Sequence, residues 1–189
     1  NRHRLPHRIQ TREKDEEIHR QVDMMLKLGV VKGSQSAHYS QVHMTPKPNG
    51  KWRFCIDYRF LNDCTKSAGW PIPHVREMLV RLGEHRAIFY AVVDLTKGYY
   101  QAPLAMVSQG VSAFITSRGL YEWVRVPMGL KTAPSYFQHQ MAKKVLGGLM
   151  YTHCEVYLDD IITWGKTEDQ YIENLRLLFT RLKEVGLTL

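Results

Sequence analysis

An α+β fold, with helices packed on one face of an antiparallel sheet, is predicted by two features of the sequence. Several segments carry apolar residues at helical spacing, whereas shorter β-branched and aromatic runs flank strong turn signals. In the second half these segments follow one another as helix, strand, hairpin, helix, hairpin and helix. The 189 residues are 44% hydrophobic, which suits one domain with a real core or two small subdomains.

The first half begins with a helix after Thr11, which Gly29 can end. Its apolar stripe comprises Ile18, Val22, Met25 and Leu28. Residues 41–58, QVHMTPKPNGKWRFCIDY, hold two β-like runs around an Asn-Gly turn signal, so we expect a hairpin. Lys47 and Lys51 lie at its tip.

A stiff, proline-containing connector at residues 69–73 leads into a helix. The apolar face of this helix comprises Val75, Met78, Leu79 and Leu82. Residues 87–95, AIFYAVVDL, form an apolar run that we expect to be a buried strand. Residues 111–116 and 121–126 flank a Ser-Arg-Gly turn and predict a second hairpin.

The last part predicts a helix after Pro134, two short strands and a final helix. The stripe of the first helix is Phe137, Met141, Val145 and Leu149. A capping box at residues 167–170 starts the final helix and Gly186 ends it. Its apolar face is Tyr171, Leu175, Leu178, Leu182 and Val185.

The net charge of +8 favours polyanionic partners, of which nucleic acid is the commonest. No apolar run is long enough to cross a bilayer, and the first ten residues lack the apolar core of a signal peptide. Cys55, Cys64 and Cys154 show neither zinc spacing nor a disulfide framework. We therefore expect buried thiols, a reducing intracellular setting and no membrane partner.

Asp159 and Asp160 interrupt a strongly apolar, β-favouring run. In a continuous strand their side chains would face opposite sides, so we expect a tight turn at the pair, because Asp tolerates turn and left-handed backbone conformations. A solvated hairpin tip is the alternative interpretation, which the apolar flanks disfavour. A third carboxylate, Asp94, ends another expected strand, and all three would converge if those strands are neighbours.

Carboxylates at close range repel one another unless a cation neutralises them. Oxygen ligands suit Mg²⁺, and two such ions about 3.5–4 Å apart can hold the attacking and leaving oxygens of a phosphoryl displacement. The site chemistry therefore indicates nucleotidyl transfer or phosphodiester cleavage, and residue spacing does not choose between them.

Four motifs then resemble those of reverse transcriptases, in the order of that family. Tyr157-Leu158-Asp159-Asp160 matches the Tyr-x-Asp-Asp box, and residues 94–101, DLTKGYYQ, resemble the first catalytic aspartate motif. Residues 52–62, WRFCIDYRFLN, and 126–134, VPMGLKTAP, complete the set. From about Leu5 to its end, the chain resembles the gypsy-type LTR retrotransposon polyprotein.

This resemblance implies a right-hand polymerase, with a fingers subdomain at residues 1–69 and 102–127. The palm would comprise residues 70–101 and 128–189, with a ferredoxin-like antiparallel sheet and helices on one face. Thumb, connection and RNase H are expected to be absent from this chain and to follow in a longer polyprotein, which also holds an integrase.

The implied activity is RNA-directed DNA polymerisation in the cytoplasm, within virus-like particles. The enzyme would use dNTPs, a primed RNA or DNA template and two Mg²⁺ ions, for which Mn²⁺ can substitute. Asp94 and Asp159 would hold the metals with Leu95, and Asp160 would support them. Leu158 would lie in the active-site floor near the primer terminus.

The resemblance also assigns nucleotide-binding residues. Lys47 and Arg53 would grip the triphosphate, although Lys51 could replace Lys47. Tyr99 would be the steric gate that selects deoxynucleotides, with Tyr100 as the neighbour that could be mistaken for it. Met128 and Gly129 are the last two residues that the resemblance assigns to nucleotide binding. Met128 stands where retroviral enzymes carry Gln and would pack beside the nucleotide, and Gly129 would let the backbone approach it.

Two groups of charged residues outside these roles remain ambiguous. Asp57 and Arg59 match the fingers motif with Asn62, and we expect the two to form a structural ion pair, with a role as substrate ligands as the alternative. The basic residues Arg2, Arg4 and Arg8 could touch template phosphate or belong to a solvated tail.

Three rival functions stay open at this point. A decayed element would bind nucleic acid without catalysis. A carboxylate–metal nuclease or nucleotidyl cyclase would need neither the sugar gate nor the basic hairpin. An RNA-binding sheet domain would bind without any dependence on metal.

Overall fold

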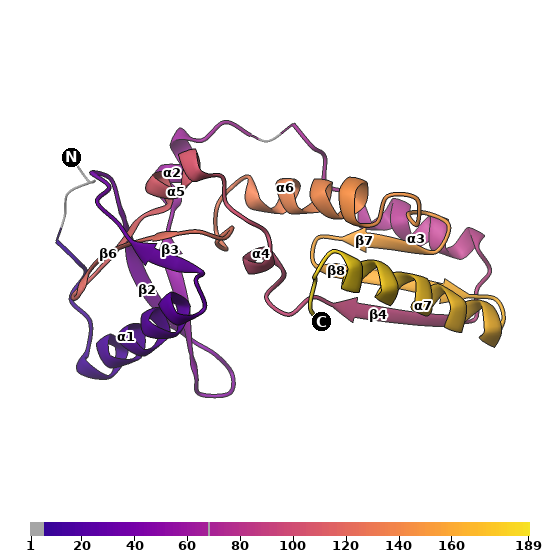
Figure 1. Cartoon of the computed structure of the whole chain (residues 1–189), viewed down its shortest axis with the longest axis horizontal. Coiled ribbons are helices and arrows are strands. Elements are labelled where there is room, and N and C mark those ends of the chain that lie inside the picture. The colour runs from indigo at the N-terminus through magenta and orange to yellow at the C-terminus, as the bar shows by residue number, and fades with distance from the viewer. Residues whose placement is uncertain (1–5, 68) are drawn as a thin grey trace. The chain divides into compact units, whose positions relative to one another are not determined.

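The computed structural model describes residues 6–67 and 69–189, and the chain divides into two compact units (Figure 1). The first unit comprises residues 1–66 and 102–133, and the second comprises residues 67–101 and 134–189. Each unit therefore combines two stretches that are separate in the sequence. Arg2 and Arg4, two of the candidate template contacts, lie outside the described residues.

A five-stranded sheet with the order β1-β6-β5-β2-β3 forms the centre of the first unit. Its strands are β1 (Val31–Gly33), β2 (Ser40–Pro46), β3 (Trp52–Asp57), β5 (Phe114–Thr116) and β6 (Gly119–Trp123). Both expected hairpins are present, because β2 pairs with β3 and β5 pairs with β6 in antiparallel fashion. A parallel pairing of β2 with β5 joins the two hairpins, and no local pattern indicated it.

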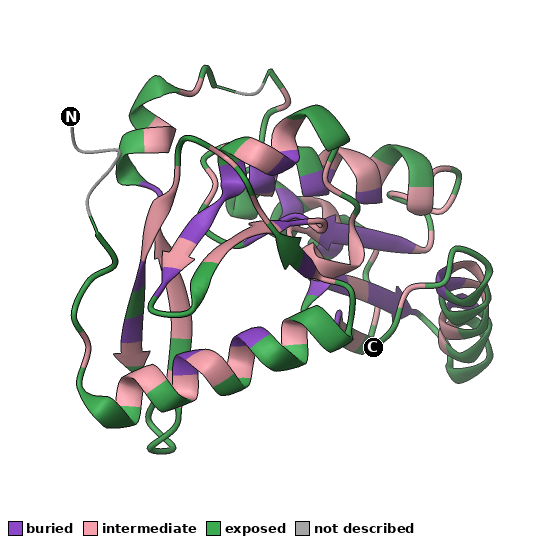
Figure 2. Ribbon diagram, turned by 60° about the vertical axis from the view of Figure 1, so that its left-hand side comes forward, coloured by how far each residue is buried: buried purple, intermediate pink, exposed green. Residues whose placement is uncertain are grey.

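Helix α1 (Arg12–Lys27) buries only Ile18 and Val22 of the predicted stripe. Met25 is partly buried, and Leu28 is 62% exposed because the helix ends before it. Ile18 and Val22 are only 2% and 1% exposed, and the rest of the helix is partly buried or exposed (Figure 2). The strand expected at residues 111–116 begins only at Phe114, because residues 110–112 form the 3₁₀ helix η2. Two short helices complete this unit, α2 (Arg59–Cys64) and α5 (Met106–Gln109).

The second unit contains a three-stranded antiparallel sheet with the order β4-β8-β7. Its strands are β4 (Phe89–Asp94), β7 (Cys154–Tyr157) and β8 (Asp160–Gly165). The helices that accompany it are α3 (Val75–Glu84), α4 (Gly98–Gln101), α6 (Ala133–His139), the π-helix η3 (Gln140–Val145) and α7 (Glu168–Glu184). The prediction of an α+β chain with an antiparallel sheet is confirmed.

Side chains of β8 alternate between two helical neighbours. Helix α7 lies against the face of Gly165 so closely that a Cβ there would be 2.5 Å from the backbone nitrogen of Tyr171. On the other face, Trp164 packs against Met78 and Leu82 of α3. Val75 and Leu79, the other two residues of the expected apolar face of α3, are 47% and 62% exposed. Helices therefore contact both faces of this sheet, α7 along one face and α3 at the Trp164 end of the other, and not one face as expected (Figure 1).

The strand expected at residues 87–95 is present as β4, but the expectation that it is buried is wrong. Val92 is 65% exposed and Tyr90 is 45% exposed, although both belong to an apolar run. The physical reason is topological, because β4 is an edge strand and these two side chains point away from the face that α7 covers. Apolar composition alone cannot distinguish an edge strand from a central one.

The ends of the last two helical segments differ in detail from the expected pattern. The stripe after Pro134 passes from α6 into η3 and ends at Val145, so Leu149 lies outside it. At α7, Thr167 Oγ1 accepts from the Gln170 N–H at 3.2 Å, as a capping box requires. The return bond is displaced by one residue, because Gln170 Oε1 accepts from the N–H of Lys166.

Of the three thiols expected to be buried, only Cys154 is buried; Cys64 is exposed. Burial raises the pKa of Cys154 to about 12, so this thiol stays protonated. None of the helices that the structure describes is long and apolar enough to cross a membrane.

Candidate active site

Asp94, Asp159 and Asp160 lie at one end of the second unit's sheet. Strand β4 pairs with β8 so that Asp94 lies directly opposite Asp160. The N–H of Leu95 donates to the carbonyl of Asp159 at 3.4 Å, which ties the end of β4 to the adjoining turn. The two strands are therefore neighbours, which is the condition that the sequence set for convergence of the three carboxylates.

The turn lies one residue earlier than expected. Tyr157 pairs with Asp160, so Leu158 and Asp159 form the turn and Asp160 is the first residue of β8. Leu158 adopts the left-handed conformation, with φ +58°, and Asp159 does not. A positive φ at the first central position only is the pattern of a type II′ turn, which usually holds Gly there. The expectation that an Asp would take the left-handed position is wrong.

The donor set at this end of the sheet fits a divalent metal with an open shell. Asp94 and Asp160 are exposed and Asp159 is partly buried. Within residues 6–67 and 69–189, no group of three His, Cys, Asp or Glu side chains is gathered closely enough to hold a metal ion. Mg²⁺ needs no closed cage, because it takes one or two carboxylates and completes its shell with water and substrate phosphates. The carbonyl of Leu95 accepts from the Gly98 N–H at 3.1 Å and keeps a second lone pair.

Helix α4 packs directly beneath the turn. A Cβ on Gly98 would lie 3.3 Å from Leu95 Cβ and Phe137 Cζ, and 3.4 Å from Asp159 Cβ. Only glycine allows this approach without displacing a neighbour. Tyr99, the next residue, stacks at an angle on Phe137 with 5.0 Å between ring centroids.

Tyr99 lies close enough to Asp159 for the two side chains to interact electrostatically. Burial and the negative charge of Asp159 together raise the pKa of Tyr99, so its hydroxyl stays protonated. The residue expected as the sugar gate is therefore beside the carboxylates, with its ring fixed against Phe137.

Gln138 of α6 is a polar residue of this site that sequence reasoning missed. It is 1% exposed, and its side chain bonds to the backbone of Val156 and Leu158. The available signal was its position three residues before Met141, which placed a polar side chain on an apolar stripe.

Three basic residues at the tip of the β2–β3 hairpin are directed to one of its faces. Its tip is closed by a bond from the Lys47 N–H to the Lys51 carbonyl at 2.7 Å, and Arg53 lies opposite Thr45. Strand alternation therefore directs Lys47, Lys51 and Arg53 to the same side. All three are exposed, so the hairpin geometry leaves both lysines as candidates.

The loop that carries Met128 and Gly129 is held by Asn62. The Asn62 side chain donates to the Gly129 carbonyl at 2.8 Å and accepts from the Lys131 N–H at 2.8 Å. Gly129 has φ +95°, a conformation that favours glycine, and Met128 is 50% exposed. Asn62 was recognised only as part of a motif, and its contact across 67 residues was not foreseen.

The expected ion pair between Asp57 and Arg59 is present and bidentate, with distances of 2.8 and 2.7 Å. Arg59 holds the pKa of Asp57 below its ordinary value. Arg8 is attached to the sheet of the first unit, because its backbone N–H donates to Gln41 Oε1 of β2 at 2.8 Å. These residues line a cavity of about 800 Å³ within the first unit.

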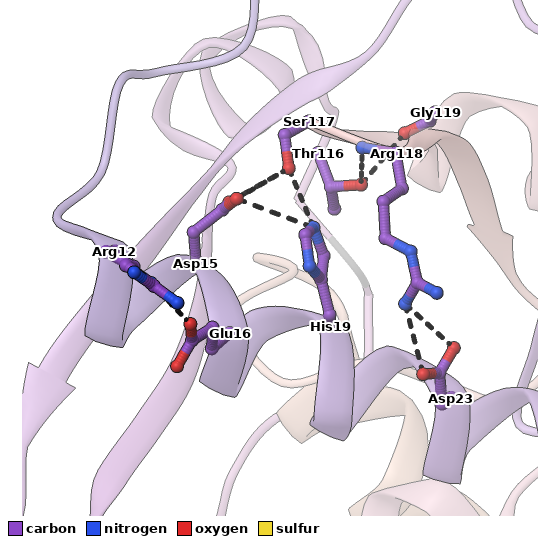
Figure 3. A network of polar contacts seen from close by, with 9 residues as sticks. All are labelled: Arg12, Asp15, Glu16, His19, Asp23, Thr116, Ser117, Arg118 and Gly119. Atoms are coloured by element: carbon purple, nitrogen blue, oxygen red, sulfur yellow. Dashed lines mark hydrogen bonds and ion pairs between the residues drawn. The ribbon is translucent and has the colours of Figure 1, made fainter.

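A second polar network contains a Ser, a His and an Asp but cannot act as a hydrolytic triad (Figure 3). His19 Nε2 lies 2.7 Å from Ser117 Oγ and 3.6 Å from Asp15 Oδ2. Both partners therefore contact the same ring nitrogen. A triad needs the carboxylate on the opposite nitrogen, so that the imidazole can relay a proton. With the Arg118–Asp23 ion pair, this network ties α1 to the β5–β6 turn.

Comparisons with known proteins agree with the motifs. A profile described as reverse transcriptase (RNA-dependent DNA polymerase) matches residues 45–189. The retrovirus-related Pol polyprotein from transposon 297 of Drosophila melanogaster is 37% identical over 178 residues, which cover 92% of this chain and 16% of that protein. Polyprotein P3 of Commelina yellow mottle virus is 30% identical over 186 residues, or 93% of this chain and 10% of that protein.

Solved structures show the same fold. The protease–reverse transcriptase of prototype foamy virus matches with a TM-score of 0.82 and 26% identity, over 98% of this chain and 25% of that one. The foamy viral enzyme in complex with an RNA/DNA hybrid matches equally well, over 99% of this chain and 24% of that one. This chain thus spans less than a fifth of the curated polyproteins named above. It has the fingers-and-palm fold of a right-hand polymerase and belongs to the reverse transcriptase (RNA-dependent DNA polymerase) family, as its resemblance to gypsy-type retrotransposon polyproteins predicted.

Proposed function

We propose that this chain carries the catalytic part of an RNA-directed DNA polymerase, which transfers a nucleotide from a dNTP to a primer 3′-hydroxyl on an RNA or DNA template. The observation that carries the proposal is the pairing of Asp94 with Asp160, next to the Asp159 turn, in a chain of this family. Residues 1–69 and 102–127 would form the fingers, and residues 70–101 and 128–189 would form the palm, with bounds close to those of the two units.

Asp94 and Asp159 would hold two Mg²⁺ ions, or Mn²⁺ in their place, with Asp160 and the Leu95 carbonyl in support. Bound ions would neutralise charge on the phosphates and position the attacking and leaving oxygens. The nucleophile is the hydroxyl of the primer, so the protein needs none of its own. Its residues act by positioning and by electrostatic stabilisation.

The nucleotide-binding roles follow from the chemistry of each side chain. The Arg53 guanidinium is suited to bidentate contact with phosphate oxygens, and Lys47 would act as a point charge. Tyr99 would leave no room for a 2′-hydroxyl. Met128, Gly129 and Leu158 would line the nucleotide and the primer terminus.

The partners would be a primer–template duplex and the remaining parts of a Pol polyprotein, namely thumb, RNase H and integrase. Solved foamy viral relatives in complex with an RNA/DNA hybrid and with double-stranded DNA support the first partner. The names of the curated relatives support the second. We also propose that the polyprotein works in the cytoplasm within virus-like particles.

The test is addition of dTTP to an oligo-dT primer on poly-rA, with Mg²⁺ or Mn²⁺. The chain, a version extended through the thumb, and Asp159→Asn variants of both would be compared. Asp159→Asn should lower the rate by at least about 10²-fold, the scale on which loss of one preorganised electrostatic contact acts. Asp169→Asn, a matched change in the first turn of α7, should retain the parent rate.

Two outcomes would contradict the proposal. Extension by Asp159→Asn at the parent rate would show that the carboxylates do not hold the catalytic metals. No extension by any version, with the primer–template still bound, would indicate a decayed element that retains the fold as a binding surface.

A further inference from the structure

The side chain of Gln138 takes the place of a missing strand at one edge of the second unit's sheet. Strand β7 is an edge strand, so the N–H and carbonyl groups of alternate residues point outward, where the sheet has no further strand to pair with them. Gln138 Nε2 donates to the Val156 carbonyl at 2.9 Å, and Gln138 Oε1 accepts from the Leu158 N–H at 2.7 Å. One amide therefore satisfies a donor and an acceptor two residues apart, as a neighbouring strand would.

The bond to Gln138 Oε1 is made by Leu158, the residue of the turn whose backbone is strained. Leu158 has φ +58°, a conformation that a Cβ disfavours and that persists only where the surroundings hold it. The Leu158 N–H is held by an amide that is itself 1% exposed and fixed on α6. The next two residues are Asp159 and Asp160, so the conformation of Leu158 decides where both carboxylates point.

We propose that Gln138 is a positioning residue for the metal-binding carboxylates. It touches neither metal nor substrate; it holds the Leu158 turn in the conformation that places Asp159 beside Asp94 and Asp160. This inference rests on the proposed function for its catalytic consequence, and its structural part can be tested separately.

The first test compares the parent with Gln138→Met, which keeps the length of the side chain and removes both hydrogen bonds. The Leu158 N–H should be protected from hydrogen exchange in the parent and lose that protection in the variant. Mn²⁺ titration without nucleic acid should show affinity weakened about tenfold or more. In primer extension, kcat should fall about 10- to 100-fold, within the loss that a 1 Å misplacement causes, and KM for the primer–template should change little.

A matched control is Gln140→Met, the same substitution two positions along the chain. It should leave amide exchange at Leu158, Mn²⁺ affinity and kcat at the parent values. Melting temperatures of both variants separate general loss of stability from the specific effect on the turn.

The second test is a rescue. Glycine adopts a positive φ without strain, so Leu158→Gly should let the turn keep its shape with less help from Gln138. The loss of Mn²⁺ affinity caused by Gln138→Met should therefore be several-fold smaller when Leu158→Gly is also present. Equal losses in both backgrounds would overturn the proposal, because the two residues would then act independently.

The outcomes also separate this inference from the proposed function. A parent that binds Mn²⁺ but extends no primer would contradict the polymerase activity, and Mn²⁺ affinity would still test the role of Gln138. Unchanged Mn²⁺ affinity in folded Gln138→Met would overturn the inference alone. If Gln138→Met does not fold, hydrogen exchange in the parent protein is the test. A Leu158 N–H that exchanges as fast as the amide of an open turn would overturn the inference.

Discussion

Gly98 offers a direct test of how tightly the carboxylates are packed. In Gly98→Ala the new Cβ would lie 3.3 Å from Leu95 Cβ and Phe137 Cζ, and 3.4 Å from Asp159 Cβ. Comfortable carbon–carbon contacts begin at about 3.5 Å, so the neighbours must yield by a few tenths of an ångström. Asp159 lies in a turn and Phe137 is 2% exposed in a helix, so we expect much of the movement to fall on Asp159.

The expected effect on catalysis follows from this displacement. A misplacement of 1 Å can cost about 10²-fold in rate, so a shift of a few tenths should cost about three- to tenfold. Stability should fall by at most about 2.6 kcal/mol, because overpacking costs about 1–3 kcal/mol while replacing a helical Gly by Ala returns about 0.4–1 kcal/mol. The variant should thus be folded, slower, and weaker in its response to Mg²⁺.

Gly83→Ala is the matched control, because Gly83 also lies in a helix and a Cβ there would meet nothing within 4 Å. It should raise the melting temperature by up to about 2–4 °C and leave the rate unchanged. The assay is steady-state primer extension across a Mg²⁺ titration, with thermal melts of each variant. A Gly98→Ala protein with the parent kcat and the parent Mg²⁺ response would refute the argument, whatever its melting temperature.

Two further predictions concern single side chains. Tyr99→Ala should raise ribonucleotide incorporation by about tenfold or more, because the ring beside Asp159 would no longer exclude a 2′-hydroxyl; competition between rNTP and dNTP measures this, and unchanged sugar discrimination would remove Tyr99 from the role. Arg59 lowers the pKa of Asp57, so the ion pair stabilises the fold above the ordinary Asp pKa of about 3.9 and loses that effect as pH falls through the lowered value. Asp57→Asn should therefore flatten the fall in melting temperature between about pH 5 and pH 2, and parallel curves for parent and variant would contradict this.

Local chemistry in the sequence was sufficient to predict the longer helices, the two hairpins of the first unit and the turn that carries the Asp pair. The Asn-Gly signal placed the β2–β3 hairpin, and helical spacing placed α1, α3 and α7. The Asp pair between two apolar runs indicated a hairpin with carboxylates at its end, which the structure shows with a shift of one residue. These features depend on residues close together in the chain, so a single sequence carries them.

Other features could be decided only by the tertiary structure, because they join segments that are distant in the chain. The parallel pairing of β2 with β5 and the exposure of β4 depend on strand order, which no local run encodes. Gln138 reaches Val156 across 18 residues, and Asn62 reaches Gly129 across 67. Both amides look like ordinary polar residues in the sequence, and each acquires its role from the backbone groups that folding brings to it. The sequence thus determined which groups can do the chemistry, whereas the packing of distant segments decided the conformation in which they are held.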